Sequence, residues 1–228
     1  MASAVITGCN RGIGESIAAV LHEAGLGVLG WNRTVAARPG GPYAEVACDV
    51  RNPDDVSRAA RELPGDLQVV VANAGVRRFG DVDALSLRDW HDSIDTNLNG
   101  VFYLARATLP RLRANRGYFV AVGSHAERYP FEQGAAYCST KLAVRGLIDC
   151  LIADARRDGV RATYLSLGAV KNREHGGDED WKLTPRDVGL VILSLLRLPD
   201  NVLIPYLDAR PLRPKRDALG GIERLQYV

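Results

Sequence analysis

The chain alternates short, wholly apolar runs with longer amphipathic segments, and this alternation constrains its fold more than any other feature. The apolar runs have the length of buried strands and lie at 3–7, 26–31, 44–50, 67–75, 117–124, 160–168 and 201–207. The segments between them with helical periodicity or helix-type ends are 14–25, 53–65, 86–113, 136–158 and 184–197. Strands that are apolar on both faces must be covered on both faces. The pattern therefore predicts an α/β fold, a doubly wound seven-stranded parallel sheet with helices on both faces.

The domain organisation follows from the length and composition. The chain has 228 residues, of which 46% are hydrophobic and 25% charged, as in ordinary globular proteins. We find no linker, repeat or low-complexity block, so residues 1–228 are expected to form a single domain.

Charge and motif content argue against several classes of partner. The net charge is only +2 and the basic residues are scattered, which indicates no nucleic-acid or membrane partner. The one dense basic run, RPLRPKR at 210–216, is interpreted as a solvated tail and not a binding patch. No run is long enough to cross a bilayer, and the N-terminus has no secretory signal pattern. The four cysteines lack CxxC spacing and the four histidines lack metal-ligand spacing, so we expect free thiols, a cytoplasmic location and no metal.

A glycine-rich turn follows the first apolar run. Its sequence is TGCNRGIG (7–14), and a helix comes directly after it. Gly8, Gly12 and Gly14 allow a tight turn, and the helix N-terminus offers free N–H groups to a pyrophosphate. The spacing is GxxxGxG, which is neither the commonest dinucleotide fingerprint nor a Walker loop. Its place after the first strand of an alternating chain nevertheless predicts nucleotide binding.

The end of the second strand indicates which dinucleotide is bound. An acid there would bind the ribose hydroxyls of NAD, but the chain has Asn32 and the cationic Arg33. Arg11 can converge on the same place, and two guanidiniums suit the extra phosphate of NADP. We therefore expect NADP, with NAD the weaker alternative, although both arginines could instead be solvent-facing loop residues. Asp49, after the third strand, could accept a hydrogen bond from the adenine amino group or simply serve a turn.

Tyr137 and Lys141 stand four residues apart in a predicted helix and therefore share one face. Ser124 ends the fifth strand, 13 residues before Tyr137, and Asn97 lies in the preceding helical region. In a doubly wound sheet the carboxyl ends of the central strands face the ligand crevice. The serine, the tyrosine and the lysine are therefore expected to converge beside a nicotinamide.

Several motifs in the same order resemble those of the short-chain dehydrogenase/reductase family, whose fold is a single-domain Rossmann fold. The resemblance covers nearly the full length, through TGCNRGIG, CDV (48–50), ANAG (72–75), TNLNG (96–100), the strand end at Ser124, and YCSTK (137–141). It implies a catalytic tetrad of Asn97, Ser124, Tyr137 and Lys141. It also implies a cofactor site made of Gly8, Asn10, Arg11, Gly12, Ile13, Gly14, Asn32, Arg33, Asp49, Val50, Asn73, Ala74, Gly75, Tyr137, Lys141, Gly168, Val170 and Asn172.

Each member of the tetrad has a chemical rationale. Reducing a carbonyl requires a hydride on carbon and a proton on oxygen. A cation one helical turn from a phenol favours the phenolate, so Lys141 would help Tyr137 to release its proton. Ser124 can donate to the carbonyl oxygen as charge develops there. Asn97 would hold a water that links Lys141 to solvent.

The chain departs from the family at three places. Ala72 stands where the family usually has an asparagine, and Leu167 stands where it usually has a proline. Asn172 lies near the position of a family threonine that contacts the nicotinamide. The substrate segment, about 171–183, is short, which predicts an open site. Polar residues that could line its substrate side, and would suit a polar or anionic substrate, are His125, Glu127, Arg128, Tyr129, Arg77 and Arg78.

The functional prediction is an NADPH-dependent reductase of a ketone or aldehyde of a small organic molecule. Two alternatives stay open: an NAD-dependent alcohol dehydrogenase, and a dinucleotide-sensing protein without catalysis. The resemblance also implies a homodimer or homotetramer packed through helix 137–158. The apolar residues on that helix are Leu142, Leu147, Ile148, Leu151 and Ile152.

Overall fold

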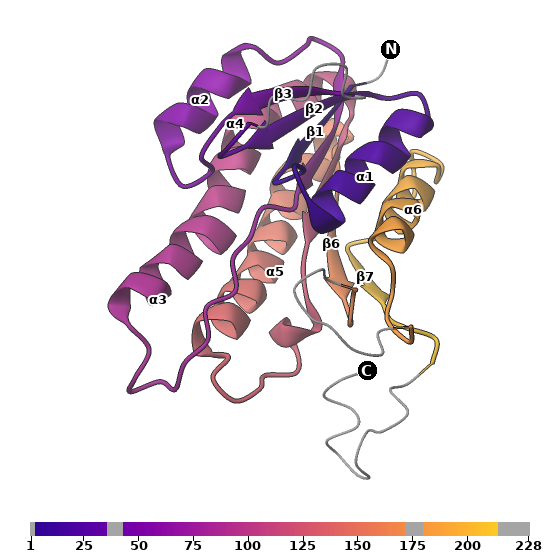
Figure 1. Ribbon diagram of the computed structural model, residues 1–228. Coiled ribbons are helices and arrows are strands. Elements are labelled where there is room, and N and C mark those ends of the chain that lie inside the picture. The colour runs from indigo at the N-terminus through magenta and orange to yellow at the C-terminus, as the bar shows by residue number, and fades with distance from the viewer. Residues whose placement is uncertain (1–2, 36–42, 172–179, 214–228) are drawn as a thin grey trace.

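Seven strands form one parallel sheet in the computed structural model, which describes residues 3–35, 43–171 and 180–213 (Figure 1). The strands are β1 (Ser3–Thr7), β2 (Gly27–Asn32), β3 (Ala44–Ala47), β4 (Leu67–Ala72), β5 (Tyr118–Val122), β6 (Arg161–Leu167) and β7 (Tyr206–Ala209). The helices are α1 (Gly12–Glu23), α2 (Pro53–Arg61), α3 (Leu87–Ile94), α4 (Gly100–Asn115), α5 (Ala135–Ala155) and α6 (Pro185–Leu196). The predicted Rossmann architecture is therefore confirmed.

The strand order is β3-β2-β1-β4-β5-β6-β7, and every pairing is parallel. From β1 the chain first adds β2 and β3 on one side and then adds β4 to β7 on the other side, so the strand order reverses between β1 and β4. In open α/β sheets, ligands bind at such a switch point, outside the carboxyl ends of the strands. The turn after β1 and the segment after β4 therefore border the expected crevice.

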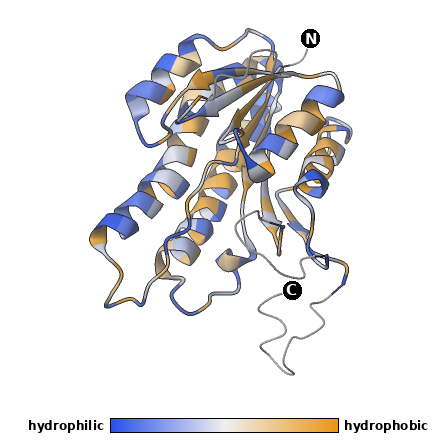
Figure 2. Cartoon of the chain, viewed as in Figure 1, coloured by the Kyte–Doolittle hydropathy of each residue, from blue (hydrophilic) through white to orange (hydrophobic). Residues whose placement is uncertain are grey.

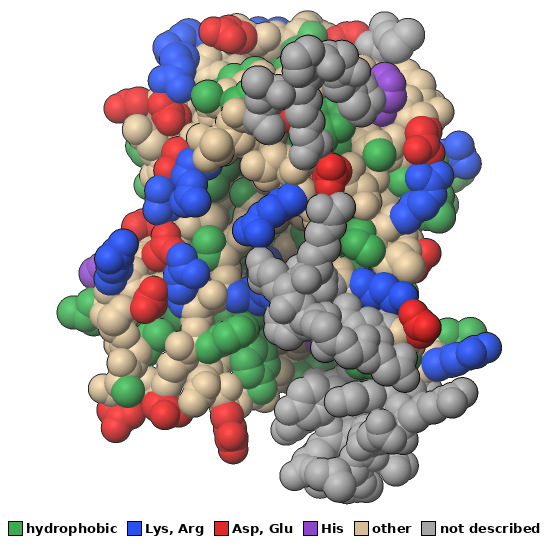
Figure 3. Space-filling view, viewed as in Figure 1, with side chains coloured by type: hydrophobic (Ala, Val, Ile, Leu, Met, Phe, Trp, Pro, Cys, Tyr) green, Lys and Arg blue, Asp and Glu red, His purple; other side chains and the backbone are tan. Residues whose placement is uncertain are grey.

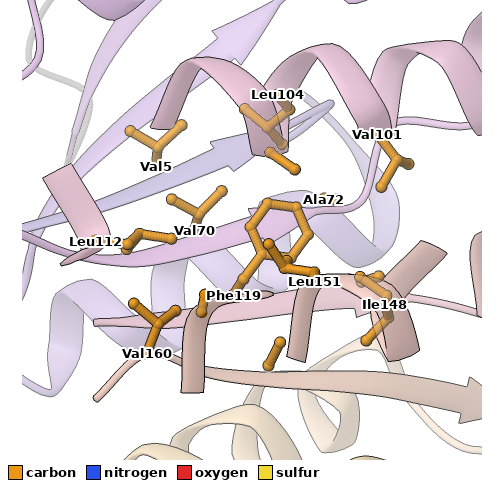
Figure 4. Packing of buried hydrophobic residues seen from close by; sticks show 14 of the residues in the cluster. Val5, Val70, Ala72, Val101, Leu104, Leu112, Phe119, Ile148, Leu151 and Val160 are labelled. Carbon is orange, nitrogen blue, oxygen red and sulfur yellow. The ribbon is translucent and has the colours of Figure 1, made fainter. Parts of the chain in front are cut away.

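Alternation along the strands explains why they are apolar throughout. Val5, Val70 and Phe119 point into a core with α2, α4 and α5, which Figure 4 shows from close by. Their strand neighbours, such as Ile6 and Val71, point into a second core with α1 and α6. Figure 1 shows these helix groups on opposite sides of the sheet, and Figure 2 shows the hydrophobic strands between them.

Several predicted elements differ from the structure. The strands expected at 44–50 and 67–75 end earlier, at Ala47 and Ala72. Helical region 86–113 is interrupted by a π-helical turn, Asp95–Asn99, which separates α3 from α4. The seventh strand was expected at 201–207 but is Tyr206–Ala209. Pro205 has no N–H to donate, so the ladder begins after it. Ile204, just before the proline, is bonded to the sheet through a side chain, because the Thr163 hydroxyl of β6 donates to its carbonyl at 2.6 Å.

The described residues form this one sheet and its helices, while the boundary at 1–228 stays a prediction. None of the helices within the described ranges is long and apolar enough to pass through a membrane. All four cysteines are free thiols.

Candidate active site

The turn after β1 has the shape of a pyrophosphate cradle. Gly8 and Gly12 have φ of 65° and 61°, the left-handed region that favours glycine. A Cβ on Gly14 would overlap the carbonyl oxygen of Gly8. Arg11, the N-cap of α1, makes no side-chain cap bond, and the first N–H groups of a helix have no partner within it. These residues fit a dinucleotide pyrophosphate because a tight glycine turn leads directly into a helix N-terminus, whose N–H groups bind anions.

The segment after β4 is bonded directly to this turn. The Asn73 amide donates to the carbonyl oxygens of Thr7 and Gly8, both at 3.0 Å. The Thr7 hydroxyl accepts from the backbone amides of Asn73 and Ala74, both at 3.0 Å. The two sides of the switch point therefore form one unit. Thr7 was missed in the sequence because no spacing rule marks a threonine at the end of a buried strand.

Asn32, the last residue of β2, is hydrogen-bonded to the turn after β1. Its side chain is buried, accepts from the Cys9 backbone amide at 2.7 Å and donates to Glu45 at 2.9 Å. The sequence placed Asn32 among the cofactor residues, but its amide is spent on these internal bonds. Arg11 and Arg33, in contrast, are exposed near the turn. The Asn10 amide donates to the carbonyl of Thr34 at 3.3 Å and so links the turn to the segment carrying Arg33.

Asp49 is held by Arg51, which sequence reasoning did not single out. The Arg51 guanidinium donates to both carboxylate oxygens, at 3.0 and 2.6 Å, and these hydrogen bonds lower the pKa of Asp49. Arg51 also donates to Asp92 at 3.0 Å. The Asp49 carboxylate is therefore already oriented, while its contact with an adenine stays a prediction. Val50 is buried, and a Cβ on Gly100 of α4 would approach it to 2.9 Å.

Lys141 is buried and fixed at the end of β5. Its ammonium donates to the carbonyl oxygen of Val122 at 2.9 Å, two residues before Ser124. The same nitrogen lies 5.7 Å from the centre of the Tyr137 ring. Tyr137 and Lys141 therefore share one side of α5, as predicted, and the ammonium lies over the face of the phenol ring.

Asn97 lies in the π-helical turn and clamps the segment after β4. Its Oδ1 accepts from the Val76 amide at 2.8 Å, and its Nδ2 donates to the Val76 carbonyl and to the Thr140 hydroxyl. Both amide hydrogens are thus used within the protein. A Cβ on Gly75 would lie 3.2 Å from Asn97 Oδ1 and 4.0 Å from Lys141 Nζ. The side chains of Asn97 and Lys141 therefore both lie next to Gly75.

Ser124 is placed by Tyr164 of β6, which the sequence did not reveal. The Ser124 amide donates to the Tyr164 hydroxyl at 3.2 Å, and a Cβ on Gly123 would overlap the Tyr164 ring. Burial raises the pKa of Tyr164 far above its usual range, so this phenol stays neutral. The Ser124 hydroxyl accepts from the Ala126 amide at 3.2 Å. That bond uses a lone pair and leaves the hydroxyl hydrogen for another acceptor.

The expected nicotinamide end is only partly described. Gly168 donates its amide to the Ala209 carbonyl at 2.9 Å, and Val170 pairs with Leu183 in an isolated parallel bridge. The Lys171 backbone amide donates to the Leu183 carbonyl at 2.8 Å, so the two ends of the predicted substrate segment are joined. Asn172 lies outside the described residues.

Four of the six polar candidates on the substrate side have partners within the protein. Tyr129 lies edge-to-face with His125 at 6.1 Å and has the Arg210 guanidinium over its ring at 5.6 Å. Arg78 pairs with Asp92 at 2.8 Å, and His125 lies 2.6 Å from Asp208. The Glu127 side chain is fully buried and accepts from the Tyr206 hydroxyl at 2.9 Å. Arg77 and Arg128 are exposed. Among the described residues, no group of three or more His, Cys, Asp or Glu side chains could hold a metal ion.

Comparisons with known proteins agree with this geometry. The family described as short chain dehydrogenase matches residues 2–181. An uncharacterized oxidoreductase of Staphylococcus aureus (strain N315) is 29% identical over 223 residues, covering 92% of this chain and 96% of that protein. The alcohol dehydrogenase of the archaeon Thermococcus sibiricus, complexed with 5-hydroxy-NADP, is 30% identical with a TM-score of 0.85, covering 94% of this chain and 99% of that one.

A closed form of serine dehydrogenase complexed with NADP⁺ is also similar. It is 27% identical with a TM-score of 0.84, covering 96% of this chain and 98% of that one. The family match spans well over half of the chain, and the fold agrees with both solved structures. The protein therefore belongs to the short-chain dehydrogenase/reductase family and is an NAD(P)-dependent oxidoreductase.

Proposed function

We propose that the protein is an NADPH-dependent reductase that converts a ketone or aldehyde of a small organic molecule to an alcohol. The observation that carries the proposal is the fixed ammonium of Lys141. It is bonded to Val122, lies against the ring of Tyr137 and adjoins Gly75 and Asn97. A buried cation beside a phenol is what proton delivery from tyrosine requires.

The residues of this chain have distinct roles in the proposal. Tyr137 gives its proton to the carbonyl oxygen, and Lys141 stabilises the phenolate that remains. The Ser124 hydroxyl donates to the same oxygen and stabilises its developing charge. Asn97 holds the Val76 backbone in place beside Lys141. When bound, NADPH supplies the hydride to the carbonyl carbon.

The cofactor would be held mainly by backbone. The pyrophosphate would lie on Gly12, Ile13 and Gly14, with Asn73, Ala74 and Gly75 along the other side. The exposed Arg11 and Arg33 would bind the additional ribose phosphate of NADP. Two of the similar structures hold NADP⁺ or an NADP derivative, which supports this preference.

The direction of the reaction follows from the cofactor, since NADPH usually serves reduction. NADP⁺-dependent oxidation of an alcohol is a second candidate, favoured by the similarity to a serine dehydrogenase. Calorimetric titration with NADPH and NADH tests the cofactor assignment. Tighter binding of NADPH is expected, and equal or tighter binding of NADH would contradict the roles given to Arg11 and Arg33.

Tyr137→Phe tests the catalytic assignment. Loss of a general acid typically lowers turnover by about 10²- to 10⁴-fold, and NADPH binding should stay unchanged. Tyr103→Phe, on α4, is a matched control that removes a phenol elsewhere and should retain full turnover. A rate like that of the wild type in Tyr137→Phe would remove Tyr137 from the mechanism. Wild-type protein that binds NADPH but reduces no carbonyl in a broad panel would support the sensing alternative.

We further propose a homo-oligomer with α5 at the contact. Of the five apolar residues expected to form it, Ile148, Leu151 and Ile152 are buried and Leu147 packs against the core. Leu142 is the one that remains exposed, at 55%. Light scattering should therefore report a dimer or tetramer that Leu142→Glu weakens, and a monomeric wild type would contradict the proposal.

A further inference from the structure

Two exposed phenylalanines lie beside the proposed proton donor. The ring centroid of Phe79 is 5.6 Å from that of Phe131 and 6.1 Å from that of Tyr137, and both pairs are edge-to-face. Phe79 is 50% exposed and Phe131 is 39% exposed. We call these three residues the aromatic wall. Large apolar side chains are normally withdrawn from water, so their position beside a reactive phenol indicates a ligand surface.

The backbone holds the aromatic wall in place. Phe79 comes from the segment after β4, and Phe131 comes from the segment between β5 and α5. These segments are joined at Gly80, whose amide donates to the Gln133 carbonyl at 3.0 Å and which pairs with Gly134. Gln133 has a φ of 61°, which a residue with a side chain adopts only when its surroundings impose it. A Cβ on Gly134 would come within 3.0 Å of the Phe131 ring, so that ring lies directly on the glycine.

Three of the polar candidates near the wall have partners within the protein. Arg78 is paired with Asp89 and Asp92, so its charge is answered within the protein. His125 is turned toward Asp208, and Glu127 is buried against Tyr206. Arg77 and Arg128 are exposed as well, but the exposed side chain that lies in ring contact with Tyr137 is Phe79, which in turn contacts Phe131. Figure 3 shows hydrophobic side chains at several places on one face of the molecule, with one larger group in its lower half.

We propose that the substrate is an aryl ketone or aryl aldehyde whose ring packs on Phe79 and Phe131. This inference rests on the proposed reductase function. Edge-to-face pairs are a preferred geometry of aromatic rings, and an added ring extends the array that Phe79 and Phe131 begin. In the reaction the carbonyl carbon gains a hydride, the carbonyl oxygen gains the Tyr137 proton, and NADPH is oxidised to NADP⁺. The aryl ring is unchanged in the alcohol product.

Two ketones of the same size separate aromatic packing from mere hydrophobic burial. Acetophenone and cyclohexyl methyl ketone are compared by kcat/KM at saturating NADPH. One or two ring contacts predict a preference for acetophenone of about tenfold. Phe79→Leu and Phe131→Leu remain apolar but lack the ring, and each should reduce that preference. The double variant should abolish it, and calorimetry on the NADP⁺-loaded protein should show weaker acetophenone binding.

Phe102→Leu is the matched control. Phe102 is 46% exposed and lies edge-to-face with Tyr103 at 6.0 Å, but it is on α4. This variant should keep the full preference, and melting temperatures check that all variants fold. The proposal is overturned by equal kcat/KM for the two ketones, by a preference that survives the double variant, by turnover of neither ketone, or by faster oxidation of L-serine than of 1-phenylethanol.

The two proposals fail in different ways. If Tyr137→Phe keeps its rate while acetophenone still binds to the wall, the reductase mechanism fails and the ring site stands. If Tyr137→Phe is inactive and the wild type has no preference for the aryl ketone, the mechanism stands and the ring site fails.

Discussion

The two halves of the site are held together in different ways. Around the turn after β1, the shape is set by main chain packed on main chain, as where Gly14 adjoins the carbonyl of Gly8. Around the ends of β5, β6 and β7, the shape is set by buried side chains, as where Glu127 meets Tyr206. The backbone half suits a ligand common to a whole family, whereas the side-chain half can differ from one family member to the next.

Electrostatics shows the same contrast. Burial alone would raise the pKa of Asp208, but hydrogen bonds from Arg210 and His125 outweigh it and lower that pKa. This carboxylate therefore stays charged inside the substrate half and orients His125, the residue after Ser124. At the turn after β1, hydrogen-bonded amides and helix N–H groups provide the polarity instead.

Gly14→Ala is the most severe test of the backbone half. The added methyl meets the Gly8 carbonyl, which belongs to the turn itself and cannot move aside without opening it. Overpacking of this kind should cost about 3 kcal/mol in the free energy of unfolding, measured by urea denaturation. NADPH affinity, measured by calorimetry, should fall by at least about tenfold as the cradle distorts. Gly65→Ala is the control, because nothing lies within 4 Å of its Cβ position. Unchanged NADPH binding in Gly14→Ala would mean that the turn is not the cradle.

Glu127→Ala is the corresponding test of the side-chain half. The change leaves the Tyr206 and Ser166 hydroxyls and the Arg145 guanidinium without their carboxylate partner. Since Arg145 reaches solvent, most of the loss comes from the buried Ser166 hydroxyl and the half-buried Tyr206 hydroxyl, and the free energy of unfolding should fall by about 2 kcal/mol. NADPH affinity should not change. Glu132→Ala, an exposed acid in the same segment, should be neutral for stability. If Glu127→Ala weakened NADPH binding as much as Gly14→Ala does, the two halves would not be separate.

The backbone half could be predicted from sequence because its rules are local. Gly8, Gly12 and Gly14 are spaced along one turn. The pair Tyr137 and Lys141 lies outside this half, in α5, but could be predicted for the same reason, because the two residues are one helical turn apart. The apolar runs similarly gave the strands, because a strand covered on both faces has a composition that needs no partner to be recognised.

The side-chain half could not be predicted in this way. Glu127 looks like an ordinary loop acid, and only the fold brings Tyr206, 79 residues further along, within hydrogen-bonding distance. Tyr164 is hidden for the same reason, since its contact with Ser124 depends on which face of β6 it occupies. Asn32 shows the same limit, since a polar residue at a strand end is compatible with either a buried or an exposed side chain, and only the structure shows that this one is buried.

Asp49→Asn sharpens the comparison through pH. Hydrogen bonds from Arg51 lower the pKa of Asp49, so the folded state favours the carboxylate. The stabilisation is present above the ordinary aspartate pKa of about 4 and is lost as the pH falls below it. Because the pair is partly exposed, we expect a loss of only about 0.5–1 kcal/mol at pH 7 in the variant. The wild type and the variant should then converge near about pH 2 in urea denaturation. Asp83→Asn, at an exposed position, should leave the pH profile unchanged, and a constant difference down to pH 2 would exclude Asp49 as its source.

Gly146→Ala adds to α5 the same methyl group that Gly14→Ala adds to the turn, and the opposite sign is expected. Gly146 is an exposed residue inside the helix, and nothing lies within 4 Å of its Cβ position. Alanine restricts the unfolded chain and favours the helix, so the free energy of unfolding should rise by about 0.4–1 kcal/mol. Gly146 is one helical turn from the exposed Leu142 and therefore lies near the proposed subunit contact. Stability is for this reason measured at a dilution where light scattering reports a monomer. A rise in dilute solution together with weaker assembly would place a partner's backbone against this turn of α5. A loss of stability in the monomer itself would show that α5 is strained at Gly146. It would contradict the open space that the structure shows around the Gly146 Cβ position.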